Sequence, residues 1–425
     1  MLLLLGAPGV SRAAEASPAD PPPLSTSDDE FLDDVSRRAF GYFLEQTDAS
    51  TGLVFDRARA DGARPAGASS NVASTAATGF GLSALAIGAR RGWIDAPAAR
   101  KRVSATLRHF AEAATHVHGW FYHFQDAASG QRVWQSEVSS IDTALLLAGV
   151  LTARQAFDGA DIARWARTIW ERVDFGWMRN GHAFLLSHGW KPESGFLPSR
   201  WDRYSELPLL YLPAIASPTH PIPAKAWYAW ERPRVRYDGY DYIGGGSLFT
   251  HQYPQAWFDL RGLRDRLPSG IDYFENSAAA TRAHRAFCLG LARKFPKSYS
   301  QNVWGITACD SAKGYMGWGG PPQDPATDGT VAPCASGGSL MFAPDICIPA
   351  LRTMRERFGD RIWGRYGFCD AFNPTIGWVD PDVIGIDTGI TLLSAENLRS
   401  GAVWRWFMHN PELPAALQAA GLRQA

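Results

Sequence analysis

The stretch that decides the fold is SDDEFLDDVSRRAFGYFLEQ, residues 27–46. Ser27 stands three residues before Glu30, which is the spacing of a helix-capping box. Apolar residues then recur at helical intervals from Phe31 to Phe43, so the segment predicts an amphipathic α-helix with one buried face.

Similar apolar runs continue along the chain, whereas alternating strand-like segments are scarce, with short candidates only at 53–55 and 184–187. No linker divides the chain. We therefore predict an all-α fold, a single domain of paired helices closed into a toroid. The further helical runs lie near residues 72–91, 97–115, 139–157, 160–173, 205–216, 276–294, 345–358, 390–408 and 411–421.

Size and charge limit the functions that remain open. The 425 residues are 46% hydrophobic, enough for a large core. Lys plus Arg equals Asp plus Glu at 42 each, so no long-range field attracts nucleic acid or an anionic membrane. No apolar stretch reaches the roughly 18 residues of a membrane span. We expect a neutral partner, no membrane span and a monomer.

The N-terminal residues predict export. The apolar run Met1–Val10 is followed by small residues, so we expect a signal peptide over residues 1–16, a flexible lead-in over 17–27 and one domain over 28–425. The mature chain would be periplasmic or secreted. The five cysteines lack the CxxC spacing of a zinc site, and both disulfides and free thiols fit the pattern. They are Cys288, Cys309, Cys334, Cys347 and Cys369.

Aromatic residues are abundant, with 17 Trp, 13 Tyr and 22 Phe. Many stand in Gly- and Pro-rich connections such as residues 118–124 and 314–322. Connections carry function more often than the elements that they join. A cleft where sugars stack on aromatic faces is one interpretation, and packing within a helical barrel is the other.

A neutral sugar substrate directs attention to carboxyl groups, because glycosidic hydrolysis needs one acid to protonate the leaving oxygen and another to activate water or attack. Glu206 precedes the apolar run 207–212. Desolvation there would raise its pKa, as a general acid requires. The alternative is a helix-start acid stabilised by the helix dipole.

Two further acidic groups stand before apolar helical runs. Glu137 and Asp142 precede the run that begins at Ala144, although Ser139 and Asp142 also have capping-box spacing. Asp387 lies between two glycines, where we expect it to approach a ligand, while Asp380 before a proline is typical of a turn.

Other site classes are absent from the sequence, which has no GxSxG, GxxxxGK[ST] or HExxH motif. The histidines in aromatic loops are candidates for binding sugar hydroxyls, and a structural role is the alternative for each. They are His118, His123, His220 and His251.

Ordered motifs across residues 29–422 resemble the bacterial glucoamylase-like family that includes endo-β-1,2-glucanases and the related domain of cyclic β-1,2-glucan synthases. The blocks that carry the resemblance are residues 51–57, 78–82, 136–149, 217–221, 248–253, 304–308, 328–330, 370–373 and 385–389.

The resemblance implies an (α/α)6 barrel with a cleft at one end that hydrolyses or transfers β-1,2-linked glucose without metal or organic cofactor. It carries catalytic candidacy to Glu206, Asp142 and Asp387. We expect Glu206 as general acid, Asp387 as base, and Asp142 to position sugar or tune pKa. The expected substrate-binding residues are Glu137, Asp202, Trp201, Tyr204, His220, His251, Trp318 and Trp378.

The leading hypothesis is thus an endo-β-1,2-glucanase. A transglycosylase on the same linkage, a non-catalytic glucan-binding protein and a polysaccharide lyase are the alternatives. The retained acids argue against the binding protein, and the neutral charge balance argues against a lyase acting on uronic acids.

Overall fold

The computed structural model describes residues 23–267, 270–322 and 326–424. The predicted signal peptide lies outside these residues, as does most of the predicted lead-in. Helix α1 spans Thr26–Glu45. The predicted capping residue was wrong by two positions: Ser25 caps the helix, and its Oγ accepts a hydrogen bond of 3.1 Å from the backbone N–H of Asp28. Asp28 stands three residues after Ser25, and its carboxylate accepts a hydrogen bond of 2.7 Å from the Ser25 hydroxyl, so the helix cap lies two residues earlier than expected.

The helices form two concentric layers, and the fold is an (α/α)6 barrel as predicted. The inner layer is α2 (Thr75–Arg91), α4 (Ser140–Ala156), α7 (Pro208–Ala216), α8 (Phe249–Trp257), α10 (Pro333–Gly337) and α12 (Gly385–Ser400). The outer layer is α1, α3 (Ala96–Glu112), α5 (Ala160–Arg172), α9 (Tyr273–Leu291), α11 (Pro344–Phe358) and α14 (Glu412–Ala419). Shorter helices are α6 (Phe175–Met178), α13 (Ala402–Met408), η1 (Gly67–Ser69), η2 (Ala224–Tyr228) and η3 (Gly359–Arg361).

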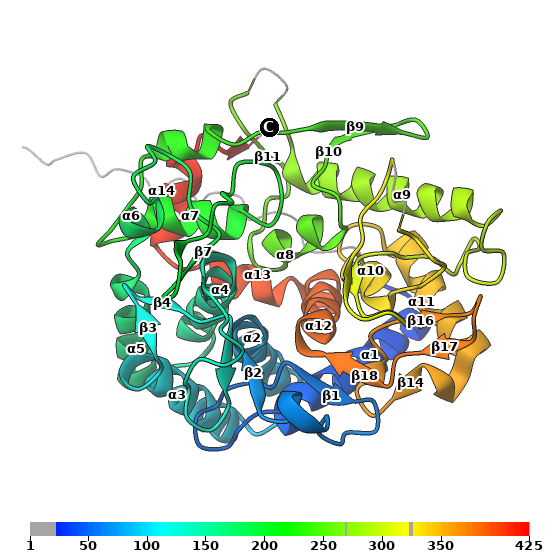
Figure 1. The fold of residues 1–425 in the computed structure, drawn as a ribbon, viewed down its shortest axis with the longest axis horizontal. Coiled ribbons are helices and arrows are strands. Elements are labelled where there is room, and N and C mark those ends of the chain that lie inside the picture. The colour runs from blue at the N-terminus through cyan, green and yellow to red at the C-terminus, as the bar shows by residue number, and fades with distance from the viewer. Residues whose placement is uncertain (1–22, 268–269, 323–325, 425) are drawn as a thin grey trace, which may run out of the picture.

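Burial patterns explain the two layers. Helix α4 is buried from Asp142 to Ala153 without interruption, which requires packing on every side. Helix α5 buries only the stripe Ile162, Ala166, Ile169 and Trp170 and presents its other face to solvent. Figure 1 shows the same arrangement, with α2, α4, α8 and α12 toward the middle and α3, α5, α9 and α11 at the periphery.

Glycine allows two inner helices to pack closely. A Cβ added to Gly79 of α2 would collide with the backbone carbonyl of Leu145 in α4, and one added to Gly149 would collide with that of Gly79. Both glycines belong to motifs that the sequence analysis singled out. The contact brings the backbones of α2 and α4 close together near the middle of α4.

The ring closes between segments that are distant in sequence. Helix α1 packs against α12, and α14 packs against α7. In Figure 1 the red α14 lies beside the green α7. The helices that seal the barrel therefore come from both ends of the described chain.

Short strands connect the helices, in keeping with the predicted scarcity of sheet. Residues 54, 55 and 187 form only isolated bridges. The strand pairs are β1 (Arg57–Arg59) with β18 (Asp382–Ile384), β2 (Val72–Ser74) with β5 (Phe124–Asp126), β3 (His116–Val117) with β4 (Trp120–Phe121), β9 (Arg234–Tyr237) with β10 (Tyr240–Ile243), and β11 (Leu263–Arg264) with β19 (Arg423–Gln424). The others are β12 (Ala308–Cys309) with β13 (Met316–Gly317), β14 (Trp363–Gly364) with β15 (Gly367–Phe368), β16 (Phe372–Asn373) with β17 (Trp378–Val379), and the sheet β6 (Val138–Ser139), β7 (Gly189–Lys191), β8 (Gly195–Phe196).

The cysteines and the helices answer two questions that the sequence raised, on disulfides and on a membrane span. All five cysteines are free and buried, so the free-thiol interpretation is the one that the structure shows. Among the described residues, the helices are too short or too polar to cross a membrane.

Candidate active site

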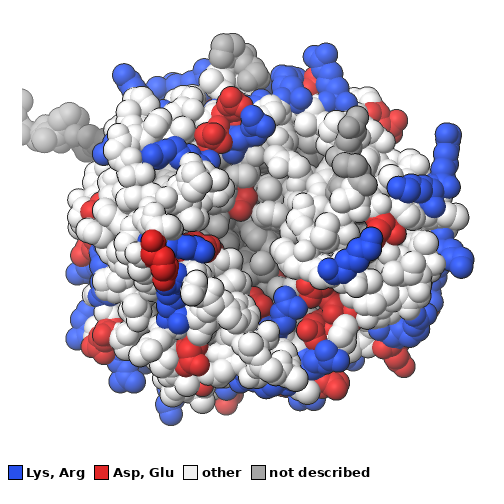
Figure 2. Space-filling view, viewed as in Figure 1, with Lys and Arg blue, Asp and Glu red and all other residues white. Residues whose placement is uncertain are grey.

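The candidate acids lie at the starts of inner helices. Asp142 is the third residue of α4, Asp387 is the third residue of α12, and Glu206 stands two residues before α7. The charge of Asp142 acts on Glu206, and Tyr253 feels the charges of both Asp387 and Glu206, so the starts of these three inner helices lie at the same end of the barrel. The face in Figure 2 is hollowed near its centre, and acidic side chains lie at this hollow and below it.

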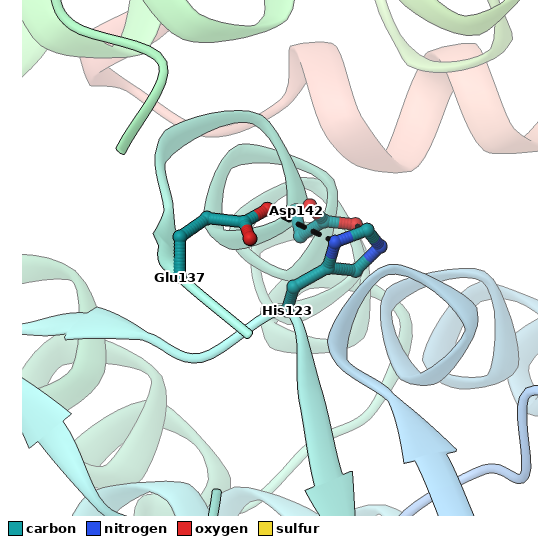
Figure 3. A group of neighbouring side chains, drawn as sticks. All are labelled: His123, Glu137 and Asp142. Atoms are coloured by element: carbon teal, nitrogen blue, oxygen red, sulfur yellow. Dashed lines mark hydrogen bonds and ion pairs between the residues drawn. The ribbon is translucent and has the colours of Figure 1, made fainter. Parts of the chain in front are cut away.

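His123, Glu137 and Asp142 form the first group, called here the histidine cluster. The imidazole Nδ1 lies 3.1 Å from a Glu137 oxygen, and Nε2 lies 3.5 Å from Asp142 Oδ1. The three side chains point toward one another (Figure 3). Ser139 caps α4 by accepting from the Asp142 N–H at 3.2 Å, and its hydroxyl donates back to the Asp142 carboxylate. Asp142 thus belongs to the capping box and to the cluster at once.

Mutual attraction sets the charges of the histidine cluster. Burial alone would lower the pKa of His123, but the carboxylates of Asp142 and then Glu137 raise it to about 9. The hydrogen bond from His123 lowers the pKa of Glu137 to about 2. Burial raises the pKa of Asp142, and the imidazolium opposes that rise. An imidazolium beside the Glu137 carboxylate is therefore the stable state near neutral pH.

Glu206 has the properties of a general acid. Burial of its carboxyl group raises its pKa to about 7, and the negative charge of Asp142 adds to the rise. A carboxyl with this pKa carries a proton for a large part of the time near neutrality. The sequence predicted the direction of this shift.

Asp387 lies in a second group with Asp310, Asp370 and Asp380, called here the aspartate cluster. Oxygens of the last three lie within 4.8 Å of one another. Asp370 accepts a hydrogen bond of 2.7 Å from the Asp310 N–H and shares another with Asp387. The thiol of Cys334 also bonds the Asp387 carboxylate.

The aspartates of this cluster differ in pKa. Burial, and then the charge of Asp387, raise the pKa of Asp370 well above its usual range. Burial and the charge of Asp370 raise that of Asp380 to about 8. Burial raises the pKa of Asp387 only to about 6, because hydrogen bonds from Asp370 and Cys334 stabilise its ionised form. Of Asp370, Asp380 and Asp387, the last therefore loses its proton at the lowest pH.

Asp56 and Arg57 connect the two clusters. The Arg57 guanidinium donates to Asp310 at 2.7 Å and to Asp56 at 3.2 Å. Asp56 in turn acts electrostatically on both His123 and Asp387. The buried Tyr253 feels the charges of both Asp387 and Glu206, so both acids lie within electrostatic range of one ring.

The two clusters are also the groups of described residues whose ligand atoms are close enough to hold a metal ion. Each cluster already contains a cation against its carboxylates. This cation is His123 in the first, and in the second it is Arg57 bonded to Asp310. These side chains supply the positive charge that a metal would otherwise bring.

The residues around Glu206 divide into buried and exposed ones. Trp201 is buried, and its Nε1 donates to Ser140 Oγ at 2.8 Å. Tyr204 is buried, and its hydroxyl lies 3.2 Å from Nδ1 of His251, which is buried as well. The rings of Tyr204 and His251 therefore pack inside the protein. Asp202 is exposed and lines a groove of about 470 Å³ together with His188. Asp202 is thus placed to meet a ligand.

The remaining predicted residues are placed differently. Trp318 is buried, with its carbonyl accepting from the Ser247 hydroxyl. Trp378 is half-buried in β17. His220 is exposed and follows the C-terminal end of α7, whereas Glu206 precedes its N-terminal end, so the structure does not bring these two together.

Sequence reasoning missed most of the aspartate cluster. Asp310 and Asp370 lie on connections 60 residues apart, and neither has an apolar helical run after it. Asp380 was interpreted as a turn residue, and it does accept from the Asp382 N–H at 3.0 Å. Its other carboxylate oxygen is buried without a hydrogen bond, which no local pattern indicates.

The fold and this site together define an (α/α)6 barrel whose acid-lined end faces a central hollow. The chain belongs to the Glycoamylase family, whose sequence profile matches residues 198–411. This confirms the resemblance that its motifs indicated.

Relatives agree with this assignment. An exo-β-1,2-glucooligosaccharide sophorohydrolase (non-reducing end) of Parabacteroides distasonis is 27% identical, over 92% of this chain and 58% of that protein, so the chain spans only part of its relative's length. The structure of an endo-β-1,2-glucanase from Chitinophaga pinensis with sophorotriose and glucose has a TM-score of 0.84 at 28% identity, covering 94% of this chain and 99% of that one. A β-1,2-glucanase structure from Parabacteroides distasonis has a TM-score of 0.83 at 26% identity, covering 94% and 60%.

Proposed function

We propose that this protein is a glycoside hydrolase that cleaves β-1,2-linked glucan in an endo manner, with Glu206 as general acid and Asp387 as general base. The observation that carries the proposal is the contrast between two buried acids near one ring, Tyr253, with pKa values of about 7 and about 6. Relatives that act on β-1,2-glucans support the substrate.

The chemistry follows from these two charge states. Protonated Glu206 donates its proton to the glycosidic oxygen while the bond from that oxygen to the anomeric carbon breaks. Ionised Asp387 accepts a proton from water, directly or through a substrate hydroxyl, as the water oxygen bonds to the anomeric carbon. Asp370 stabilises the ionised base by a hydrogen bond before this step.

The test is cleavage of linear and cyclic β-1,2-glucan, with β-1,3-glucan as a substrate control and chromatographic sizing of products. We expect short oligosaccharides from β-1,2-glucan, and a loss of about 10²- to 10⁴-fold in kcat for Glu206→Gln. Glu231→Gln, an exposed acid paired with Arg203 at 3.0 Å, is the matched control and should retain activity. Full activity of Glu206→Gln would remove Glu206 from this role.

Added acceptor sugars distinguish hydrolysis from transfer. Products longer than the substrate would make the protein a transglycosylase instead. Release of sophorose alone from chain ends would make it exo-acting.

We also propose that residues 28–425 act as one domain and one monomer outside the cytoplasm, after removal of residues 1–16. Support comes from the apolar leader and from a site built within a single chain. Cell fractionation and sizing of the mature protein test both points.

A further inference from the structure

A strained turn presents a tryptophan beside the histidine cluster. The Ser136 N–H donates to the Val133 carbonyl at 3.1 Å, so Trp134 and Gln135 are the central residues of a tight turn. Their φ angles are +56° and +51°, both in the left-handed region. Turns with positive φ at both central positions favour Asn, Asp and Gly, which adopt this conformation at low cost. A bulky ring is among the least suitable choices for such a position.

Surrounding contacts hold the turn in place. Arg132 donates to the Ser136 carbonyl at 2.5 Å and forms a two-point ion pair with Glu193 at 2.5 and 3.0 Å. Its guanidinium also lies 5.2 Å from the centre of the Tyr122 ring. The tryptophan is thus presented by an anchored turn.

The ring of Trp134 remains in contact with water. The Trp134 side chain is 48% exposed, and its ring packs edge to face against Phe124, with 5.1 Å between the ring centres. Phe124 stacks on His123 at 3.8 Å, so a single ring separates Trp134 from the histidine cluster. Among the described residues, only Tyr315 and Ile376 are other large hydrophobic side chains with comparable exposure.

Tyr315 lies near the aspartate cluster. It is 54% exposed, and its hydroxyl feels the charge of Asp387. Two of the three exposed large hydrophobic side chains therefore lie near the clusters, Trp134 near the histidine cluster and Tyr315 near the aspartate cluster. Each exposed ring offers a flat apolar face on which a ligand can pack.

We propose that Trp134 is a stacking platform for a glucosyl ring of the bound glucan, at a subsite next to the histidine cluster. The ligand class is a neutral pyranose, whose C–H face packs on an aromatic ring without needing a charge. The identity of this ligand rests on the proposed function. The strained turn persists because the exposed ring gains its partner only when substrate binds.

Matched substitutions separate a binding role from a structural one. Trp134→Gly removes the ring and suits positive φ, and we expect an unchanged or higher Tm with a KM about tenfold higher on long β-1,2-glucan and a much smaller change in kcat. Trp134→Phe should restore part of the affinity. Ile376→Ala, a residue with similar exposure in the β16–β17 turn, is the control and should leave KM unchanged. A lower Tm with an unchanged KM for Trp134→Gly would overturn the platform.

Calorimetric binding makes the outcome independent of hydrolysis. In a Glu206→Gln background, β-1,2-glucooligosaccharides of increasing length are titrated into protein with and without Trp134→Gly. Weaker binding of longer chains by the double variant supports the platform even if the wild-type protein cleaves no glucan. Equal affinity at every length overturns it even if hydrolysis is established.

Discussion

Helices α4 and α12 place a buried aspartate at the same helical position but surround it with opposite chemistry. Asp142 faces the imidazolium of His123, whereas Asp387 faces the carboxyl of Asp370 and the thiol of Cys334. Helix N-termini favour anions in both cases. The comparison teaches that the partners decide the role: a neighbouring cation favours the charged form of Asp142, while a shared proton suits an acid such as Asp387 that changes charge during a reaction.

The largest expected effect comes from neutralising each aspartate in turn. Asp387→Asn should lower kcat on β-1,2-glucan about 10³-fold, because a general base is lost. Asp142→Asn should lower it only about tenfold, because its charge acts on Glu206 from outside the reacting atoms. Rates of reducing-sugar release at pH 6.5 measure both. The reverse order would make Asp142 the base.

The pH dependence of kcat should sharpen the comparison next. Activity should fall below about pH 6 as Asp387 gains a proton and above about pH 7 as Glu206 loses one. Asp142→Asn removes a negative charge that raises the pKa of Glu206, so the alkaline limb should move to lower pH by up to about one unit. If the alkaline limb stays at the same pH in this variant, the charge of Asp142 does not influence the pKa of Glu206.

The histidine cluster should also influence stability. The pKa of His123 is raised from 6.5 to about 9 in the folded protein. Its charged form therefore contributes stability that is fully present below about pH 6.5 and is lost as pH rises through 9. His123→Gln should lower the free energy of unfolding most at pH 6, with a difference that shrinks by pH 10. Denaturant titrations across this range measure it, and a difference independent of pH would contradict the ion pairs.

The smallest effect is expected at Cys334. Its thiol lowers the pKa of Asp387 by hydrogen bonding the carboxylate. Cys334→Ala should raise that pKa and move the acid limb upward by a few tenths of a pH unit, while Cys334→Ser keeps a donor and should move it less. Equal shifts in the two variants would indicate a packing effect instead.

Much of the fold could be predicted because outer helices carry regular apolar stripes and several inner ones are apolar throughout. Helix α8 was missed because its buried polar residues interrupt that pattern. Gln252 and Gln255 bond the carbonyls of Ala335 and Tyr273, at 2.8 and 2.6 Å, and no local rule reveals such distant partners. The run predicted at 390–408 is two helices, because Gly401 adopts a φ of +63° between α12 and α13.

The candidate acids could be picked out from the sequence where they stand at the start of an inner helix, as at Glu206, Asp142 and Asp387. Residues that reach the same place from connections could not be found this way. Asp370 is an example, because its raised pKa depends on burial and on Asp387. Such effects arise from tertiary packing, which periodicity does not encode.

Closure of the ring has a consequence for how the chain acquires its structure. Helix α12 must find α1 across more than 300 residues, and α7 must wait for α14 near the end of the described chain. Contacts of such long sequence separation slow folding and leave apolar inner helices exposed in intermediates. During synthesis the barrel would remain incomplete until α14 has been made. We therefore expect assistance from chaperones to matter most before that point.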